Sequence, residues 1–167
     1  DLDFGVRRDE VNRKSKFNSV AKDLDFNSTS FVLGFGFDLT TTADLSFSFG
    51  SVERAPSSVE LFMNGEHAAV QRNEIGDPTL KAEEARNIDL SLNFENDLIY
   101  GSINFYQNEV DNYIYRKDSG VKGSGEMKLE IANFVQKDAE LDGYEIKFGT
   151  DLDFLNGNLG VTIGRAV

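Results

Sequence analysis

The segment from residue 31 to residue 49, FVLGFGFDLTTTADLSFSF, decides the fold class. Apolar side chains occupy every second position on both sides of three threonines: Phe31, Leu33, Phe35, Phe37 and Leu39, then Ala43, Leu45, Phe47 and Phe49. Alternation with period two places such side chains on one face of a strand. The run Thr40-Thr41-Thr42 is short enough for a tight turn. The segment therefore predicts an antiparallel hairpin with one apolar and one polar face.

The same alternation recurs along most of the chain and predicts about seven strands. It is seen at 2–6, 88–94, 99–105, 129–131, 144–148 and 159–163. No window shows the period of about 3.6 residues that marks an amphipathic helix. The fold class is all-β.

The connections predict how the strands are arranged. Short turns are expected at Thr40-Thr41-Thr42, Asn96-Asp97 and Asn156-Gly157, and long polar connections at about 12–27, 54–82 and 116–126. Short and long connections alternate, so an up-and-down sheet would carry its tight turns at one end and its long loops at the other. This asymmetry is typical of transmembrane β-barrels of the outer membrane.

Strand length and strand number indicate a fragment of such a barrel. The segments 100–115 and 127–150 read as extended far beyond the usual five to six or so residues, and the shift of apolar parity near Gly143 predicts a β-bulge there. Bacterial barrels have even strand numbers, and a free strand edge in lipid would leave backbone amides unpaired. The 167 residues are therefore expected to form part of a larger barrel.

Composition excludes several classes of function. Asp and Glu total 29 against 17 Lys and Arg, a net charge of -12, which is the wrong sign for a nucleic-acid-binding protein. The chain has no cysteine and a single histidine, and it has no G-x-S-x-G nucleophile motif. We expect no catalytic residues, no enzymatic activity and no cofactor.

A set of motifs carries a resemblance to a known family. The motifs are ERAPSSVELF at 53–62, NGEH at 64–67, EIGDPTLKAE at 74–83, NIDL at 87–90, NFY at 104–106, NYI at 112–114, Asn133, and DAELDGYE at 138–145. In this order and spacing they resemble the C-terminal half of the barrel in TonB-dependent outer-membrane receptors. The Gly65-Glu66-His67 and Gly76-Asp77-Pro78 segments are most similar to the zinc- and haem-uptake, ZnuD-like subgroup.

The resemblance implies a barrel of about 22 strands closed around an N-terminal plug. Residues 1–167 would supply about a third of the wall, without the plug or the TonB box. The implied location is the outer membrane of a Gram-negative bacterium, as a multi-pass protein in contact with lipid and lipopolysaccharide. The implied partners are the TonB complex, acting through the plug, and a metal, haem or metal–siderophore ligand.

The motif residues with expected structural roles are Arg54, Pro56, Glu60, Gly65, Gly76, Pro78, Glu83 and Gly143. Pro56 should end strand pairing because it has no amide donor. Gly76-Asp77-Pro78 is expected to form a turn, because Gly tolerates positive φ and Asp caps its own backbone. Arg54 and Glu83 should face each other at the base of the long loop, either as an ion pair or as two solvated charges.

His67 is the candidate metal or haem ligand, with Glu66, Glu74 and Asp77 in the same loop. Zinc is bound by nitrogen, oxygen and sulfur ligands in tetrahedral sets. One histidine with scattered carboxylates has no ligand spacing of this kind, so the alternative is that His67 packs on its loop neighbours.

Two other functions remain open from the sequence. A soluble or surface-exposed β-sandwich that binds carbohydrate, or acts as an adhesin, would show the same alternation with its apolar face turned inward. A porin-like barrel without active transport would share the strands but not the ordered motifs.

Overall fold

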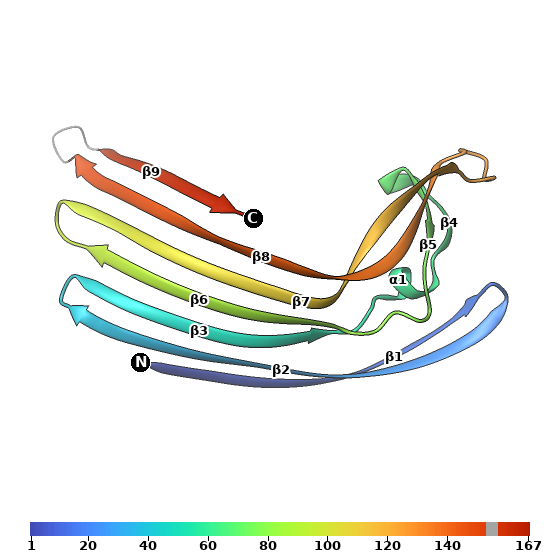
Figure 1. Cartoon of the computed structure of the whole chain (residues 1–167), viewed down its shortest axis with the longest axis horizontal. Coiled ribbons are helices and arrows are strands. Elements are labelled where there is room, and N and C mark those ends of the chain that lie inside the picture. Colours follow the sequence, from blue (N-terminus) through green and yellow to red (C-terminus); the bar gives the residue numbers. More distant parts are fainter. Residues whose placement is uncertain (153–156) are drawn as a thin grey trace.

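The computed structural model describes residues 1–152 and 157–167, with side chains described at 1–150 and 159–167. Within these residues nine strands form one open sheet (Figure 1). Two short strands belong to a connection, and the other seven form the wall, as predicted. The wall strands are β1 (Leu2–Phe17), β2 (Val20–Thr40), β3 (Ala43–Arg54), β6 (Glu83–Glu95), β7 (Ile99–Lys122), β8 (Glu130–Leu152) and β9 (Gly157–Ala166).

Each wall strand pairs antiparallel with the next wall strand in the chain, which confirms the up-and-down topology. Tight turns after β2 and β6 lie at one end of the sheet, here called the turn end (Figure 1). The opposite end, the loop end, carries the connections after β1, β3 and β7. The expected turn at Asn156-Gly157 includes a residue outside the described ones.

Of the predicted long connections, the one at 12–27 is wrong, and the one at 116–126 is shorter and lies at 123–129. Residues 12–27 form the ends of β1 and β2, joined by a two-residue turn at Asn18 and Ser19 with φ of 48° and 67°. β7 likewise continues through residues 116–122. Polar composition predicted loops here, but these strand ends lie beyond the apolar region of the sheet, where a strand needs no alternating apolar residues.

Rows of paired residues across the sheet define its two faces. On the apolar face, Phe35–Phe47–Leu90–Phe105–Tyr144 form one row and Phe37–Leu45–Leu92–Ile103–Ile146–Ile163 form the next. On the polar face, the corresponding row is Gly36–Ser46–Ser91–Asn104–Glu145–Gly164. The alternation seen in single strands is therefore in register over six neighbouring strands.

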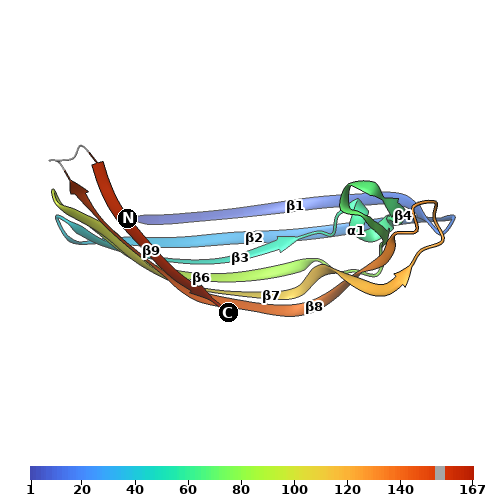
Figure 2. The same cartoon turned by 90° about the horizontal axis from the view of Figure 1, so that it is seen from above.

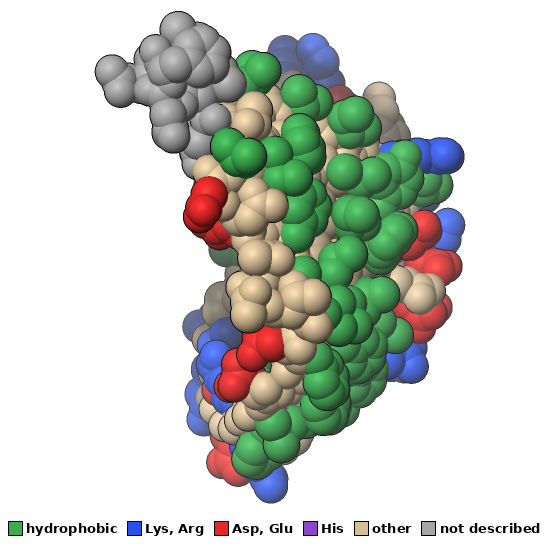
Figure 3. Space-filling model, turned by 90° about the vertical axis from the view of Figure 1, so that its left-hand side faces the viewer, with side chains coloured by type: hydrophobic (Ala, Val, Ile, Leu, Met, Phe, Trp, Pro, Cys, Tyr) green, Lys and Arg blue, Asp and Glu red, His purple; other side chains and the backbone are tan. Residues whose placement is uncertain are grey.

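The apolar face is solvent-exposed in the described residues and has the height of a membrane. Phe4 is 77% exposed and Ile163 62%, and Figure 3, a view along the strands from the turn end, shows the hydrophobic side chains gathered on one side of the sheet. On β2 the band runs over the nine residues from Phe31 to Leu39. A tilted transmembrane strand takes about 9 to 11 residues. Toward the loop end the band stops at the row Ser51–Arg86–Glu109–Glu140.

The predicted bulge at Gly143 is wrong, and the irregularity lies on the neighbouring strand. Gly143 pairs regularly with Tyr106, whereas the register shifts between Val110 and Tyr113, with Asn112 at φ 56°. A Cβ on Gly143 would clash with the backbone carbonyl oxygen of Arg165 on β9 and would lie 2.5 Å from the hydroxyl oxygen of Tyr106. Glycine is needed here because the backbone of β9 and the tyrosine ring both lie against it.

Candidate functional site

The connection between β3 and β6 folds into a compact unit, here called the folded loop (residues 55–82). It contains α1 (Ser58–Phe62), β4 (Asn64–His67), a 3-10 turn (Ala68–Val70) and β5 (Arg72–Ile75). β5 pairs in parallel with residues 130–133 at the start of β8. Figures 1 and 2 show α1 and the β4–β5 hairpin at the loop end, between the outer ends of β1–β2 and of β7–β8. No helix in the described part of the chain is long and apolar enough to cross a bilayer.

A small hydrophobic core holds the folded loop against the polar face. Its buried members are Leu61, Phe62, Leu80, Ile114 and Phe134, with Phe17, Leu24 and Phe26 packed against them. On β2, Leu24 and Phe26 share the parity of the polar face. Apolar side chains of the polar face thus gather under the folded loop, and this core joins the loop to the β1–β2 and β7–β8 hairpins.

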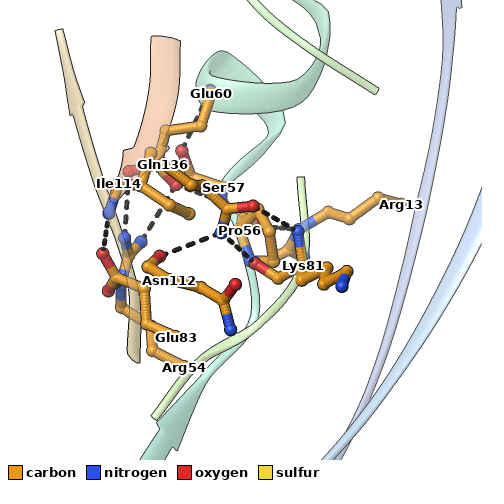
Figure 4. Close-up of polar contacts among 10 residues, drawn as sticks. All are labelled: Arg13, Arg54, Pro56, Ser57, Glu60, Lys81, Glu83, Asn112, Ile114 and Gln136. Atoms are coloured by element: carbon orange, nitrogen blue, oxygen red, sulfur yellow. Dashed lines mark hydrogen bonds and ion pairs between the residues drawn. The ribbon is translucent and has the colours of Figure 1, made fainter. Parts of the chain in front are cut away.

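Charged residues at the base of the folded loop form a network (Figure 4). Arg54 contacts Glu83 at 2.5 Å and Glu60 at 3.0 Å, which confirms the predicted Arg54–Glu83 contact. Glu60 also accepts the backbone N–H of Ser57, and Ser57 caps the N-terminus of α1 through its hydroxyl. This capping box fixes where the helix begins.

The end of the folded loop is bonded to β7 and β8. Glu83 is 8% exposed and accepts the backbone N–H of Ile114 at 2.6 Å. Gln136 exchanges two hydrogen bonds with the backbone of Lys81 and donates a third to the carbonyl of Asn112. Buried polar groups such as the Glu83 carboxylate are nearly always bonded in this way, and these contacts attach the base of the loop to β7 and β8.

We predict that this network loosens in acid through Glu60. Burial alone would raise the pKa of Glu60, but the hydrogen bonds from Arg54 and Ser57 outweigh it and hold that pKa below the ordinary 4.5. The contribution of Glu60 is therefore complete above about pH 4.5 and is lost as the pH falls through the lower folded-state pKa. An environment-sensitive dye on Val59→Cys should report a transition below that pH. Glu60→Gln should remove the part of this transition that protonation of Glu60 causes. A transition that is unchanged in Glu60→Gln would contradict the role given to Glu60.

The two motif prolines and Gly76 shape the folded loop, but Gly76 does so differently from the prediction. Its φ is not positive; instead, a Cβ would lie 2.7 Å from the backbone of Leu61 and Phe62, so glycine is required by close approach to α1. Asp77, as predicted, accepts the backbone N–H of Thr79 at 2.8 Å, in the turn that holds Pro78. Pro56 is buried two residues after β3 ends.

The structure brings together two of the four candidate ligand residues. His67 Nδ1 lies 2.6 Å from Glu74 Oε2, and the other carboxylate oxygen of Glu74 accepts from Arg116 at 3.0 Å. Glu66 instead accepts the backbone N–H of Met127, and Asp77 is engaged with Thr79. Gly65 pairs with Glu74 in the β4–β5 hairpin.

The His67–Glu74–Arg116 cluster attaches the β4–β5 hairpin to β7. Glu74 is 2% exposed, and Arg72 adds a paired contact to Asp118 on β7. The described residues contain no group of three His, Cys, Asp or Glu placed to hold a metal ion. Arg116 was not predicted, because no local pattern links it to a carboxylate 42 residues earlier.

Comparison with known families gives the decisive observation. Residues 1–165 match the model of the family described as TonB dependent receptor-like, beta-barrel.

The chain belongs to the TonB-dependent receptor family.

The similar proteins are larger receptors and transporters. The chain is 24% identical over 164 residues to hemoglobin-haptoglobin-binding protein A of Haemophilus influenzae, covering 91% of this chain but 15% of that protein. Its fold matches the copper transporter OprC with a TM-score of 0.74 at 20% identity, over 99% of this chain and 25% of the transporter. It also matches the FrpB iron transporter of Neisseria meningitidis, with a TM-score of 0.64 at 17% identity, over 99% and 23% of the two chains. Two of these proteins are named as transporters, of copper and of iron, and the third as a binding protein. Members of the family are outer-membrane β-barrels of Gram-negative bacteria.

Proposed function

We propose that this chain is the wall segment of an outer-membrane receptor that captures a metal, haem or metal–siderophore ligand at its loop end and imports it with energy from the TonB complex. The observation that supports this most directly is the apolar band, continuous over neighbouring wall strands and about as tall as the outer-membrane belt. The apolar band contacts lipid, with lipopolysaccharide next to the charged row beyond it. The polar face lines the lumen, where a plug domain acted on by TonB would sit.

The similar proteins support the ligand class. Two are named as iron and copper transporters, one as a hemoglobin-haptoglobin-binding protein, and another is a hemophore receptor from Serratia marcescens in complex with hemophore and heme. A receptor of metal-bearing nutrients is the function they share.

The candidate ligand residues belong to this proposal. His67 bonds Glu74 through Nδ1 while its side chain is 39% exposed, so the imidazole is reachable from solvent. Glu66 lies beside it, with one carboxylate oxygen buried and without a hydrogen-bond partner in the described structure. Glu74 acts by holding the His67 ring, and Asp77 acts by shaping the turn that holds Pro78. In the ZnuD-like form of the proposal, His67 contacts zinc or haem iron.

A β-sandwich module is the competing function, and the described residues disfavour it. A sandwich would bury the apolar face against a second sheet, whereas here side chains of that face such as Phe4 and Ile163 are exposed.

Uptake by cells that carry the intact receptor tests the proposal. Replacing residues 57–80 with a short Gly-Ser linker should lower uptake of radiolabelled haemin, ferric enterobactin or zinc by at least about tenfold, equivalent to ~1.4 kcal/mol. The amount of receptor in the outer membrane should stay unchanged, because the wall strands do not depend on the loop for pairing. Depletion of TonB in cells with the wild-type receptor should give the same loss. Equal uptake in all three strains would contradict the proposal.

A further inference from the structure

The connection between β7 and β8 folds back over one face of the β4–β5 hairpin. This connection, here called the tip loop (residues 123–129), lies beside the hairpin at the loop end (Figures 1 and 2). Glu66 of β4 and Asn73 of β5 are direct cross-strand partners, so their side chains leave the same face of the hairpin with Cβ atoms about 4.5 to 5.5 Å apart. Because successive side chains of a strand alternate, this face is opposite to the one that carries His67 and Glu74.

The main chain of the tip loop lies directly against both side chains. A Cβ on Gly123 would overlap the side chain of Asn73, and a Cβ on Gly125 would overlap the carboxylate of Glu66. The backbone N–H of Met127 also donates to Glu66 Oε2 at 3.1 Å. Two glycines are therefore needed where the tip loop closes over this pair, because only glycine allows so close an approach of the backbone.

Each of the two covered side chains has one oxygen atom without a partner. Glu66 Oε1 and Asn73 Oδ1 are both buried and accept no hydrogen bond in the described structure. Buried side-chain polar atoms are bonded in the large majority of cases, and an ionised carboxylate and an amide oxygen are both acceptors, so they cannot bond each other. Among the described side chains no cationic group forms an ion pair with Glu66. The covered face thus lacks a positive centre.

The chemistry of these atoms fits a hard cation. Calcium is bound by carboxylate, asparagine and main-chain carbonyl oxygens and by water, about six to eight in all. One carboxylate and one amide oxygen under a stretch of main chain provide this kind of ligand. Zinc in proteins takes tetrahedral sets rich in nitrogen and sulfur, and the described residues contain no group of three His, Cys, Asp or Glu placed to hold a metal ion. Magnesium demands a nearly ideal octahedron. Calcium is the ion that this site suits.

We infer that Glu66 Oε1 and Asn73 Oδ1 bind a calcium ion beneath the tip loop, with main-chain carbonyl oxygens of the loop and water as its other ligands. The ion fastens the β7–β8 connection to the hairpin that carries His67 on its other face. It is a structural ion and not the imported cargo, so the inference goes beyond the proposed function. With a single carboxylate the affinity is modest, about 0.1 to 1 mM, as in extracellular calcium modules.

Hydrogen–deuterium exchange of the purified full-length receptor, read by mass spectrometry on peptides that contain the tip loop, tests the site. After divalent ions are removed with EDTA, about 5 mM calcium should slow exchange of the wild-type tip loop at least about fivefold, the factor 1 + [Ca²⁺]/Kd for a Kd of about 1 mM. Glu66→Gln keeps the size of the side chain but removes its charge, so calcium should slow exchange less than about twofold.

Two further variants make the test specific. Asn73→Asp adds a second carboxylate to the site, so half-maximal slowing should occur at a calcium concentration about threefold lower or less. Without calcium its tip loop should exchange faster than that of the wild type, because like charges then lie directly opposite each other. Glu126→Gln is the matched control, since it removes an exposed carboxylate from the same loop. It should respond to calcium like the wild type.

Three results would overturn the site. They are a wild-type tip loop that calcium does not slow, which would leave the two oxygens bonded to water only, equal slowing in Glu66→Gln and the wild type, and a higher calcium requirement in Asn73→Asp. Heat-modified electrophoretic mobility confirms that each variant is folded, and Asn73→Asp keeps the test decisive if Glu66→Gln does not fold. The measurement involves no cargo, so its failure would leave the proposed import function intact.

Discussion

Ile103→Arg is expected to destabilise the membrane-inserted receptor by about 2 to 4 kcal/mol, the cost of a cation at the middle of a barrel's lipid face. Ile103 lies in the row Phe37–Leu45–Leu92–Ile103–Ile146–Ile163, well inside the apolar band. The matched control is Asn104→Arg, one residue further along β7. Asn104 faces the lumen and pairs with Glu145, so an arginine there is hydrated and lies next to a carboxylate. Its expected cost is below about 1 kcal/mol.

Reversible folding of the full-length receptor into lipid vesicles, with urea as denaturant, measures this difference. The two variants add the same side chain at adjacent positions of one strand, so both have the same added charge and the same strand propensity of arginine. The difference between them reports the environment of the side chain. Equal destabilisation would mean that β7 does not have one face in lipid.

Glu83→Ala is expected to undock the base of the folded loop at a cost of about 1 to 3 kcal/mol, the cost of a buried donor left without its acceptor. The substitution removes one of the two carboxylates that hold Arg54 and leaves the buried N–H of Ile114 without its acceptor. The loss at Ile114 is uncompensated, because this N–H is buried. Arg54 keeps Glu60 and, being 44% exposed, also reaches water.

Limited trypsin digestion of the receptor in vesicles reports the undocking, since Arg72 and Lys81 lie in or beside the folded loop. Glu83→Ala should be cleaved at these residues much faster than the wild type. Glu84→Ala, the neighbouring glutamate of opposite parity, should behave like the wild type. Resistance of Glu83→Ala equal to that of Glu84→Ala would show that the network does not hold the loop.

The wall of the barrel was predictable from the sequence because a strand in lipid must alternate. The hairpin around Thr40-Thr41-Thr42 and the seven wall strands follow from this alternation alone. Beyond the lipid band the constraint disappears, so the polar ends of β1, β2 and β7 were predicted as loops. The backbone there still pairs, and backbone pairing has no requirement for a particular side-chain pattern.

Contacts in the candidate site were predictable only where they join residues that face each other on paired strands. Arg54 and Glu83 end β3 and begin β6, so their contact follows from strand pairing. The contacts of Glu74 with Arg116 and of Gln136 with Lys81 depend on how the folded loop crosses the polar face, which local sequence does not encode. The same is true of Gly76: its turn was predictable, but the close approach of α1 was not.

The hydrogen bond from Arg13 to the carbonyl of Pro56 shows a further limit of sequence reasoning. Residues 12–27 read as a polar connection, so Arg13 carried no expectation of lying near Pro56. Only the long β1–β2 hairpin, paired in register from Phe17–Val20 to Leu2–Phe35, places it on the polar face.

Cysteine accessibility along β8 tests the central claim most directly. These 167 residues contain no cysteine. In a receptor background without other cysteines, the single variants Tyr144→Cys, Glu145→Cys, Ile146→Cys, Lys147→Cys and Phe148→Cys can be read in isolated outer membranes with a water-soluble maleimide. We predict that the variants at 145 and 147 react with the reagent and that those at 144, 146 and 148 are protected. When the protected variants are labelled with a fluorescent maleimide in the denatured state and then refolded into lipid, brominated lipid should quench their fluorescence. Equal reactivity at all five positions would contradict a wall with one face in lipid and the other facing a lumen.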